Sequence, residues 1–230
     1  MDLDLVRRAG GRVVVTALAG EPGRDYDTAT ANGVRHFRAV GAGDVIGAPD
    51  AREDEAAALE AVASARLLVL PGGSPTRLLR ALNETGMAEA VAALLADGGV
   101  VMGASAGAMV LCPWTVLPDR RSGGALAVEP GLALVGDLLV VPHWSGGSSR
   151  GDWLRSIEAA VPATTTVLGI PEESTRSASE AIVIRSALVS LTSDSGSAAW
   201  TAARAAEIVR WLRNSSGPVT SVIRPRMSDA

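Results

Sequence analysis

Short apolar runs recur along this chain, and the segments between them are rich in helix-forming residues. The runs occupy residues 13–17, 67–70, 100–102, 137–141 and 165–170. They are apolar along most of their length and do not alternate with polar residues, which is typical of strands covered by helices on both faces. Helices are expected at 26–40, 53–65, 76–82, 87–96 and 152–160. The sequence therefore predicts an α/β fold with a doubly wound, mostly parallel sheet and helices on both faces.

The alternation of strands and helices weakens after about residue 177. We expect one or two strands within 181–191 and a helix at 198–213. A chain of 230 residues, 47% of them apolar, is long enough to bury one sizeable core. We therefore predict a single α/β domain over residues 1–213 and a flexible C-terminal tail over 214–230.

Lysine is absent from the chain, and all 21 basic residues are arginine. This excludes Schiff-base lysines, phosphate-loop lysines and Ser-Lys nucleophile pairs. The two histidines, His36 and His143, and the single cysteine, Cys112, are too few for the common zinc and dithiol motifs. We therefore expect no metal and no cofactor.

The formal net charge of −4 has the wrong sign for a surface that neutralises nucleic-acid phosphates. No run approaches the roughly 18 to 20 apolar residues needed to cross a bilayer, and the apolar run at 13–19 is too short for a secretory signal. We expect a small peptide or another small molecule as partner, no nucleic acid, no membrane, and a cytoplasmic location. The sequence does not indicate an oligomeric state.

Residues 103–108 read GASAGA and fit the nucleophile-elbow pattern G-x-S-x-G, in which a sharp strand-to-helix turn exposes a serine hydroxyl. A strand is expected before Ser105 and a helix after it, and its neighbours are all Gly or Ala, as a tight turn requires. A second match surrounds Ser149, but no strand is expected directly before this serine and no helix directly after it. Ser105 is therefore the candidate nucleophile.

A serine nucleophile needs a base, and in a chain without lysine the ordinary candidates are the two histidines. His143 follows an expected strand, at the edge where open α/β sheets bind their ligands. His36 lies within an expected helix and is interpreted as structural. The imidazole in turn needs a carboxylate to orient it, and the candidates are Glu172, Glu173 and Asp119.

The oxyanion formed in acyl transfer needs preorganised hydrogen-bond donors. Gly72 and Gly73 lie in the PGGSP turn at 71–75, directly after an expected strand, and Ala106 follows the candidate nucleophile. We expect the backbone amides of these three residues to form the oxyanion hole. Cys112 is interpreted as a buried thiol that fills space in the core.

Four motifs follow one another along the chain: PGGSP at 71–75, GASAGA at 103–108, VVPHW at 140–144 and LGIPEES at 168–174. In this order they resemble the dipeptidase E and cyanophycinase family of serine peptidases over residues 11–174. The resemblance implies a class I glutamine amidotransferase-like fold. It also implies Ser105 as nucleophile, His143 as base and Glu172 as the acid.

Known members of that family cleave dipeptides with an N-terminal aspartate, or the aspartyl-arginine polymer cyanophycin. An acidic substrate would need a cationic clamp, and the candidates near the motifs are Arg77, Arg120, Arg121 and Arg176. Working glutamine amidotransferases look similar but carry Cys at the elbow, where this chain has Ser105. The chain order Ser, His, Glu also differs from that of the α/β-hydrolases.

Members of the family begin with an additional strand and a Gly-rich turn ahead of the strand placed here at 13–17. We expect this chain to lack that first strand because of a truncated or misassigned start. The leading functional hypothesis is a serine peptidase that hydrolyses a small peptide through an acyl-enzyme. The alternatives are a catalytically silent binding or structural module with the same fold, and an esterase.

Overall fold

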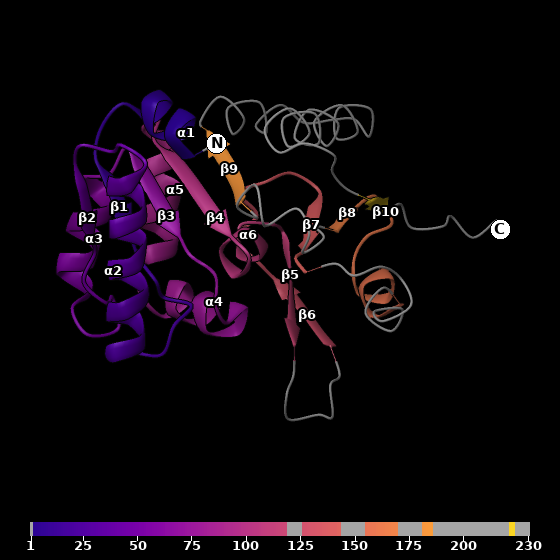
Figure 1. Cartoon of the computed structure of the whole chain (residues 1–230). Coiled ribbons are helices and arrows are strands. Elements are labelled where there is room, and N and C mark those ends of the chain that lie inside the picture. The colour runs from indigo at the N-terminus through magenta and orange to yellow at the C-terminus, as the bar shows by residue number, and fades with distance from the viewer. Residues whose placement is uncertain (1, 119–125, 144–154, 170–180, 186–220, 224–230) are drawn as a thin grey trace. The chain divides into compact units, whose positions relative to one another are not determined.

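The computed structural model describes residues 2–118, 126–143, 155–169, 181–185 and 221–223 (Figure 1). The chain divides into two compact units. The first contains Met1–Ala108 and Ala181–Ser193, and the second contains Met109–Glu180 and Asp194–Ala230. The single domain over 1–213 and the tail over 214–230 stay predictions.

The first unit is built on a sheet with strand order β2-β1-β3-β4-β9. Its parallel strands are β1 (Val13–Val15), β2 (Val45–Gly47), β3 (Leu67–Leu70) and β4 (Val100–Ala104), and β9 (Ala181–Arg185) pairs antiparallel with β4. The helices that precede β4 are α1 (Asp2–Ala9), α2 (Arg24–Ala39), α3 (Glu55–Ala63), α4 (Pro75–Glu84) and α5 (Met87–Ala96), and α6 (Ala106–Val110) follows it. The predicted doubly wound, mostly parallel α/β fold is confirmed.

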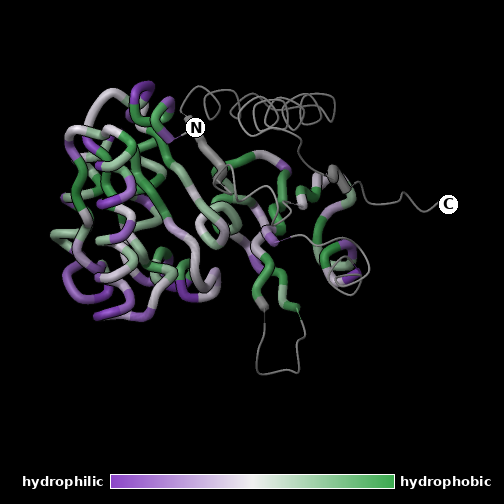
Figure 2. Tube along the Cα trace, in the orientation of Figure 1, coloured by the Kyte–Doolittle hydropathy of each residue, from purple (hydrophilic) through white to green (hydrophobic). Residues whose placement is uncertain are grey.

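Alternate residues of these strands pack on opposite sides of the sheet, as the two-residue period of a strand requires. On one side, a core cluster combines strand residues such as Val15 and Val69 with Leu5 of α1 and Phe37 of α2. Val14, Leu68 and Val101 alternate with that set and are fully buried, as are Val62 of α3 and Val91 of α5. Figure 2 shows the apolar colour concentrated along the strands and the polar colour on the outer turns of the helices.

Helix α1 was not predicted from the sequence. Its charges suit the helix dipole, because Asp2 and Asp4 lie in the first turn and Arg7 and Arg8 lie in the last. Only Leu5 is buried, so the apolar signal of this eight-residue helix is too brief for a periodicity argument.

The second unit contains a hairpin and a small sheet. Strands β5 (Trp114–Pro118) and β6 (Leu126–Pro130) pair antiparallel, and β7 (Leu138–Val141) pairs parallel with β8 (Thr166–Gly169). Strand β10 (Ser221–Ile223) pairs antiparallel with β8, and a helical segment covers 155–160. The core of this unit includes Met109, Val116, Leu139, Val141 and Ile157.

None of the helices in the described ranges is long and apolar enough to cross a membrane. The cytoplasmic location stays a prediction.

Candidate active site

Ser105 occupies a strained turn between β4, which ends at Ala104, and α6, which begins at Ala106. Its backbone φ is +47°, in the left-handed region that side-chain-bearing residues rarely adopt. Such strain persists only where the surroundings enforce it, and it concentrates at functional sites. Ser105 is half-buried. The strand, turn and helix of the nucleophile-elbow pattern are therefore all present around this serine.

The two glycines of the motif allow backbone segments to approach each other closely. A methyl group on Gly107 would lie 2.1 Å from the carbonyl oxygen of Leu70, the last residue of β3. A methyl group on Gly103 would lie 2.5 Å from the backbone of Gly107. Real Cβ atoms do not approach other atoms this closely, so a larger residue at either position would move the turn that carries Ser105.

The PGGSP turn lies beside Ser105 because β3 and β4 are neighbouring parallel strands, with Leu70 paired to Gly103. A methyl group on Gly72 would lie 3.1 Å from the Cβ of Ser105 and 3.6 Å from its Oγ. Gly73 has a φ of +145°, and a methyl group there would lie 2.9 Å from both the Cβ and the carbonyl oxygen of Ala19. The turn therefore requires glycine at position 73, and a side chain at position 72 would crowd Ser105.

Two backbone amides of the PGGSP turn, those of Gly72 and Gly73, differ from the amide of Ser74, which donates to the carbonyl oxygen of Ala19. Within the part of the chain that the structure describes, the amides of Gly72 and Gly73 donate to no acceptor. The amide of Ala106 belongs to the first residue of α6, where a helix offers no acceptor of its own. The structure thus brings Ser105, Gly72, Gly73 and Ala106 together at the carboxyl ends of β3 and β4.

His143 lies in the second unit, two residues after the end of β7. It is exposed, and its φ of +55° is also left-handed, so its backbone is strained like that of Ser105. Strand β8 runs parallel to β7, with Gly169 paired to Val141, and the sequence reaches Glu172 three residues after Gly169.

Several candidates fall outside the described residues. These are the carboxylates Glu172, Glu173 and Asp119, the second elbow match at Ser149, and the arginines Arg120, Arg121 and Arg176.

Of the proposed clamp arginines, Arg77 lies within the described residues, and its side chain already has partners. The guanidinium donates to the carbonyl oxygen of Ala19 at 3.0 Å and forms an ion pair with Glu21. Arg77 lies on α4, whose first turn is capped by Ser74: the serine Oγ accepts a hydrogen bond from the Arg77 amide at 3.3 Å.

The second histidine, His36, and the cysteine, Cys112, both lie in surroundings that indicate a structural role. The Nε2 of His36 lies 2.7 Å from a carboxylate oxygen of Asp2, and the ring stacks edge-on against Phe37. Cys112 is fully buried, and burial raises the pKa of its thiol to about 12 although a hydrogen bond with the backbone of Val140 lowers it. A thiol with this pKa is not a nucleophile at neutral pH, which agrees with its interpretation as a core residue.

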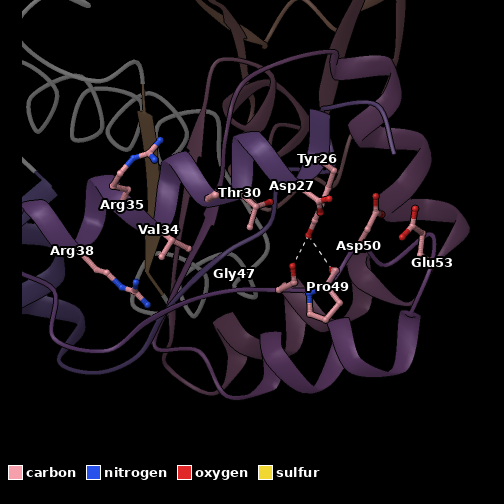
Figure 3. Close-up of a pocket in the computed structure, with 12 residues that line it drawn as sticks. Tyr26, Asp27, Thr30, Val34, Arg35, Arg38, Gly47, Pro49, Asp50 and Glu53 are labelled. Carbon is pink, nitrogen blue, oxygen red and sulfur yellow. Dashed lines mark hydrogen bonds between the residues drawn. The ribbon is translucent and has the colours of Figure 1, made fainter. Parts of the chain in front are cut away.

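A cavity of about 710 Å³ lies between α2 and the segment that follows β2 (Figure 3), and Ser105 is not among the residues that line it. At this cavity the Tyr26 hydroxyl donates to the carbonyl oxygens of Ala48 and Pro49, at 2.9 and 3.0 Å. Burial raises the pKa of Tyr26, so the hydroxyl stays protonated and anchors the chain after β2.

Arg52 and Asp50, in the same segment after β2, were missed by the sequence analysis. The buried Asp50 carboxylate accepts two hydrogen bonds from the Arg52 guanidinium, at 2.8 and 2.7 Å, and these bonds raise the pKa of Arg52. Arg52 also donates to the carbonyl of Gly20 at 2.9 Å. The Asp-x-Arg spacing after a strand is the signal that could have indicated this pair.

Within the described ranges, no three His, Cys, Asp or Glu side chains gather in a way that could hold a metal ion.

Comparison with known proteins relates the chain to peptidases. Residues 6–183 match Peptidase family S51. A Peptidase E from Salmonella arizonae is 30% identical over 127 residues, which cover 51% of this chain and 53% of the relative. The chain thus matches about half the length of this curated relative.

Two solved structures share the fold. A peptidase from an acI-B1 Actinobacterium superposes with a TM-score of 0.60 at 21% identity, covering 80% of this chain and 76% of the other. A candidate Peptidase E protein from Listeria monocytogenes EGD-e superposes with a TM-score of 0.53 at 20% identity, covering 76% of this chain and 82% of the other. Because the family match extends over most of the sequence, from before β1 to β9, we conclude that the chain belongs to peptidase family S51.

Proposed function

We propose that this chain is a serine peptidase that cleaves an amide bond of a small peptide, with Ser105 as nucleophile, His143 as general base and Glu172 as the acid. The observation that carries the proposal is the turn at Ser105. A serine with a φ of +47° sits between a buried strand and a helix, directly beside Gly72 and Gly73, whose amides have no acceptor among the described residues. Membership of peptidase family S51 supports the same chemistry.

In the proposed mechanism, His143 takes the hydroxyl proton as the Oγ of Ser105 attacks the scissile carbonyl carbon. The amides of Gly72, Gly73 and Ala106 stabilise the developing oxyanion. The imidazolium then gives its proton to the leaving amine, which departs and leaves an acyl-enzyme. Water, activated by the same imidazole, attacks the acyl carbon and releases Ser105.

The choice of Glu172 as the acid is supported by the pairing of β7 and β8. Val141 and Gly169 are register partners, His143 is two residues beyond the first and Glu172 is three residues beyond the second. In the sequence, both residues therefore follow shortly after the paired ends of two neighbouring parallel strands, which supports the choice of Glu172. Glu173 and Asp119 are the competing carboxylates.

The natural substrate is proposed to be a dipeptide with an N-terminal aspartate, because known members of the family that the chain resembles cleave such dipeptides. The peptidase proposal is tested by hydrolysis of a dipeptide panel before and after Ser105→Ala. We expect this variant to lower kcat/KM by about 10⁴ or more, because the remaining groups cannot form an acyl-enzyme.

The matched control for Ser105→Ala is Ser149→Ala, which removes the serine of the second G-x-S-x-G match. We expect this control to keep wild-type activity. A fluorophosphonate probe should label the wild type and Ser149→Ala but not Ser105→Ala. Equal hydrolysis by the wild type and Ser105→Ala would refute the proposal, and hydrolysis of matched esters without any hydrolysis of the amides would reassign the enzyme as an esterase.

A further inference from the structure

The loop that follows β1 is held by two arginine side chains from outside the loop. Arg77 of α4 donates to the carbonyl of Ala19 at 3.0 Å, and Arg52 donates to the carbonyl of Gly20 at 2.9 Å and to that of Leu18 at 3.5 Å. Three consecutive carbonyls therefore accept hydrogen bonds from guanidinium groups. Each arginine is itself paired, Arg77 with Glu21 and Arg52 with Asp50.

The same loop supports the glycine turn beside Ser105. The Ala19 carbonyl accepts a second hydrogen bond, from the amide of Ser74 at 3.0 Å. Gly73 is so close to Ala19 that a methyl group on it would lie 2.9 Å from the Ala19 carbonyl oxygen. A displacement of Ala19 would therefore move Gly73 and Ser74, and with them Gly72 beside the proposed nucleophile.

We propose that Arg77 is a positioning residue: its guanidinium, oriented by Glu21, holds the Ala19 carbonyl against the PGGSP turn and keeps the Gly72 and Gly73 amides in place beside Ser105. The inference rests on the proposed peptidase function, because it assigns those amides to the oxyanion. Arg77 acts through the loop and does not touch the substrate. Oxyanion donors act through their placement, and misplacement by about 1 Å costs about a hundredfold in rate.

The competing role for Arg77 is that of a clamp for an acidic substrate. The two roles differ in what Glu21 does. As part of a positioning pair, Glu21 helps catalysis because it orients the guanidinium. In a clamp, Glu21 would compete with the substrate carboxylate, so its removal would favour acidic substrates.

The experiment measures kcat and KM of Arg77→Met and Glu21→Ala on one aspartyl dipeptide and one neutral dipeptide that the wild type hydrolyses. We expect Arg77→Met to lower kcat by about ten- to a hundredfold on both substrates, with KM within about twofold of the wild type. Glu21→Ala should also lower kcat, but by a smaller factor, because the hydrogen bond from Arg77 to the Ala19 carbonyl survives. A loss confined to the aspartyl substrate, a gain on it in Glu21→Ala, or an unchanged kcat in Arg77→Met would each overturn the proposal.

The matched controls are Arg80→Met and Glu84→Ala, on the same helix. The Nε of Arg80 lies 3.8 Å from the Oε1 of Glu84, and each side chain is 69% exposed. Their ion pair therefore contributes little to stability. Both controls should keep wild-type kcat, and thermal unfolding of all four variants checks that the fold is intact.

A second measurement does not depend on activity. Hydrogen exchange of the Ser74 amide, which donates to Ala19, should become at least about tenfold faster in Arg77→Met and stay unchanged in Arg80→Met. Unchanged Ser74 exchange in Arg77→Met would overturn the positioning role even if the wild type cleaves peptides. If the wild type hydrolyses no peptide, the peptidase proposal fails, and the Ser74 amide still decides whether Arg77 holds the turn.

Discussion

Two glycines on either side of Ser105 have a steric role that no other residue can fill. The missing side chain at Gly107 leaves room for the Leu70 carbonyl oxygen, and the one at Gly103 leaves room for Gly107 itself. Both contacts are with backbone atoms, which cannot rotate away as a flexible side chain can. The conformation of Ser105, the proposed nucleophile, therefore depends on residues that carry no reactive group.

Replacing Gly107 by alanine tests this dependence. We expect Gly107→Ala to lower the free energy of unfolding by about 3 kcal/mol or more, since overpacking against backbone forces α6 away from β3. The matched control is Gly43→Ala, because a methyl group there meets nothing within 4 Å and should change stability by less than about 0.5 kcal/mol. Urea unfolding of both variants measures the difference, and equal midpoints would contradict the steric account.

At the scale of elements, the sequence predicts the apolar strands and the longer helices well. Strand β3 at Leu67–Leu70 and helix α5 at Met87–Ala96 have the predicted bounds, because both are bordered by Gly or Pro. Strand β2 at Val45–Gly47 was not predicted, since three residues with one buried side chain give no readable pattern. The hairpin of β5 and β6 was missed for a related reason: the side chains of β6 are only partly buried or exposed.

Part of the candidate site can likewise be predicted from the sequence, and part of it cannot. Ser105, His143 and the glycine turn can be found from sequence because they follow strands and sit in recognisable motifs. The arginine contacts cannot, because Arg77 lies 56 residues from Glu21 and 58 residues from Ala19. Only the parallel arrangement of β1 and β3 brings these segments to one edge.

The parallel pairing of β7 and β8 leads to a prediction about the acid of the proposed triad. We expect Glu172→Gln to lower kcat by about 10⁴, because an amide stabilises the wrong imidazole tautomer. Glu173→Gln and Asp119→Asn should lower kcat by less than about tenfold, since a solvated carboxylate away from the ring has no such role. Steady-state kinetics of the three variants decides among them, and the largest loss in Asp119→Asn would identify Asp119 as the acid and refute the choice of Glu172.

At the scale of the whole molecule, the buried thiol of Cys112 links global stability to alkaline pH. Its pKa is raised from 9.0 to about 12 in the folded state, so the unfolded chain loses the thiol proton at a lower pH than the folded chain does. The stabilising effect of the protonated thiol is thus complete below about pH 9 and is lost progressively between pH 9 and 12.

We therefore expect the wild type to lose about 1.4 kcal/mol more stability than Cys112→Ala between pH 8 and pH 10. Ionisation of all other groups is common to both proteins and cancels in this comparison. Chemical unfolding at the two pH values provides the measurement. Parallel losses in the two proteins would mean that the thiol is ionised at a similar pH in the folded and unfolded states.

The close contacts of Gly103 and Gly107 fix the backbone around Ser105, and they do not fix which element the side chain carries beyond its Cβ. Gly103 and Gly107 contact main-chain atoms, so neither of these contacts depends on whether oxygen or sulfur is attached to the Cβ of Ser105. Ser105→Cys should therefore keep the conformation of the turn. In evolutionary terms, a single base change in the codon can exchange the hydroxyl of the proposed nucleophile for a thiol on the same scaffold.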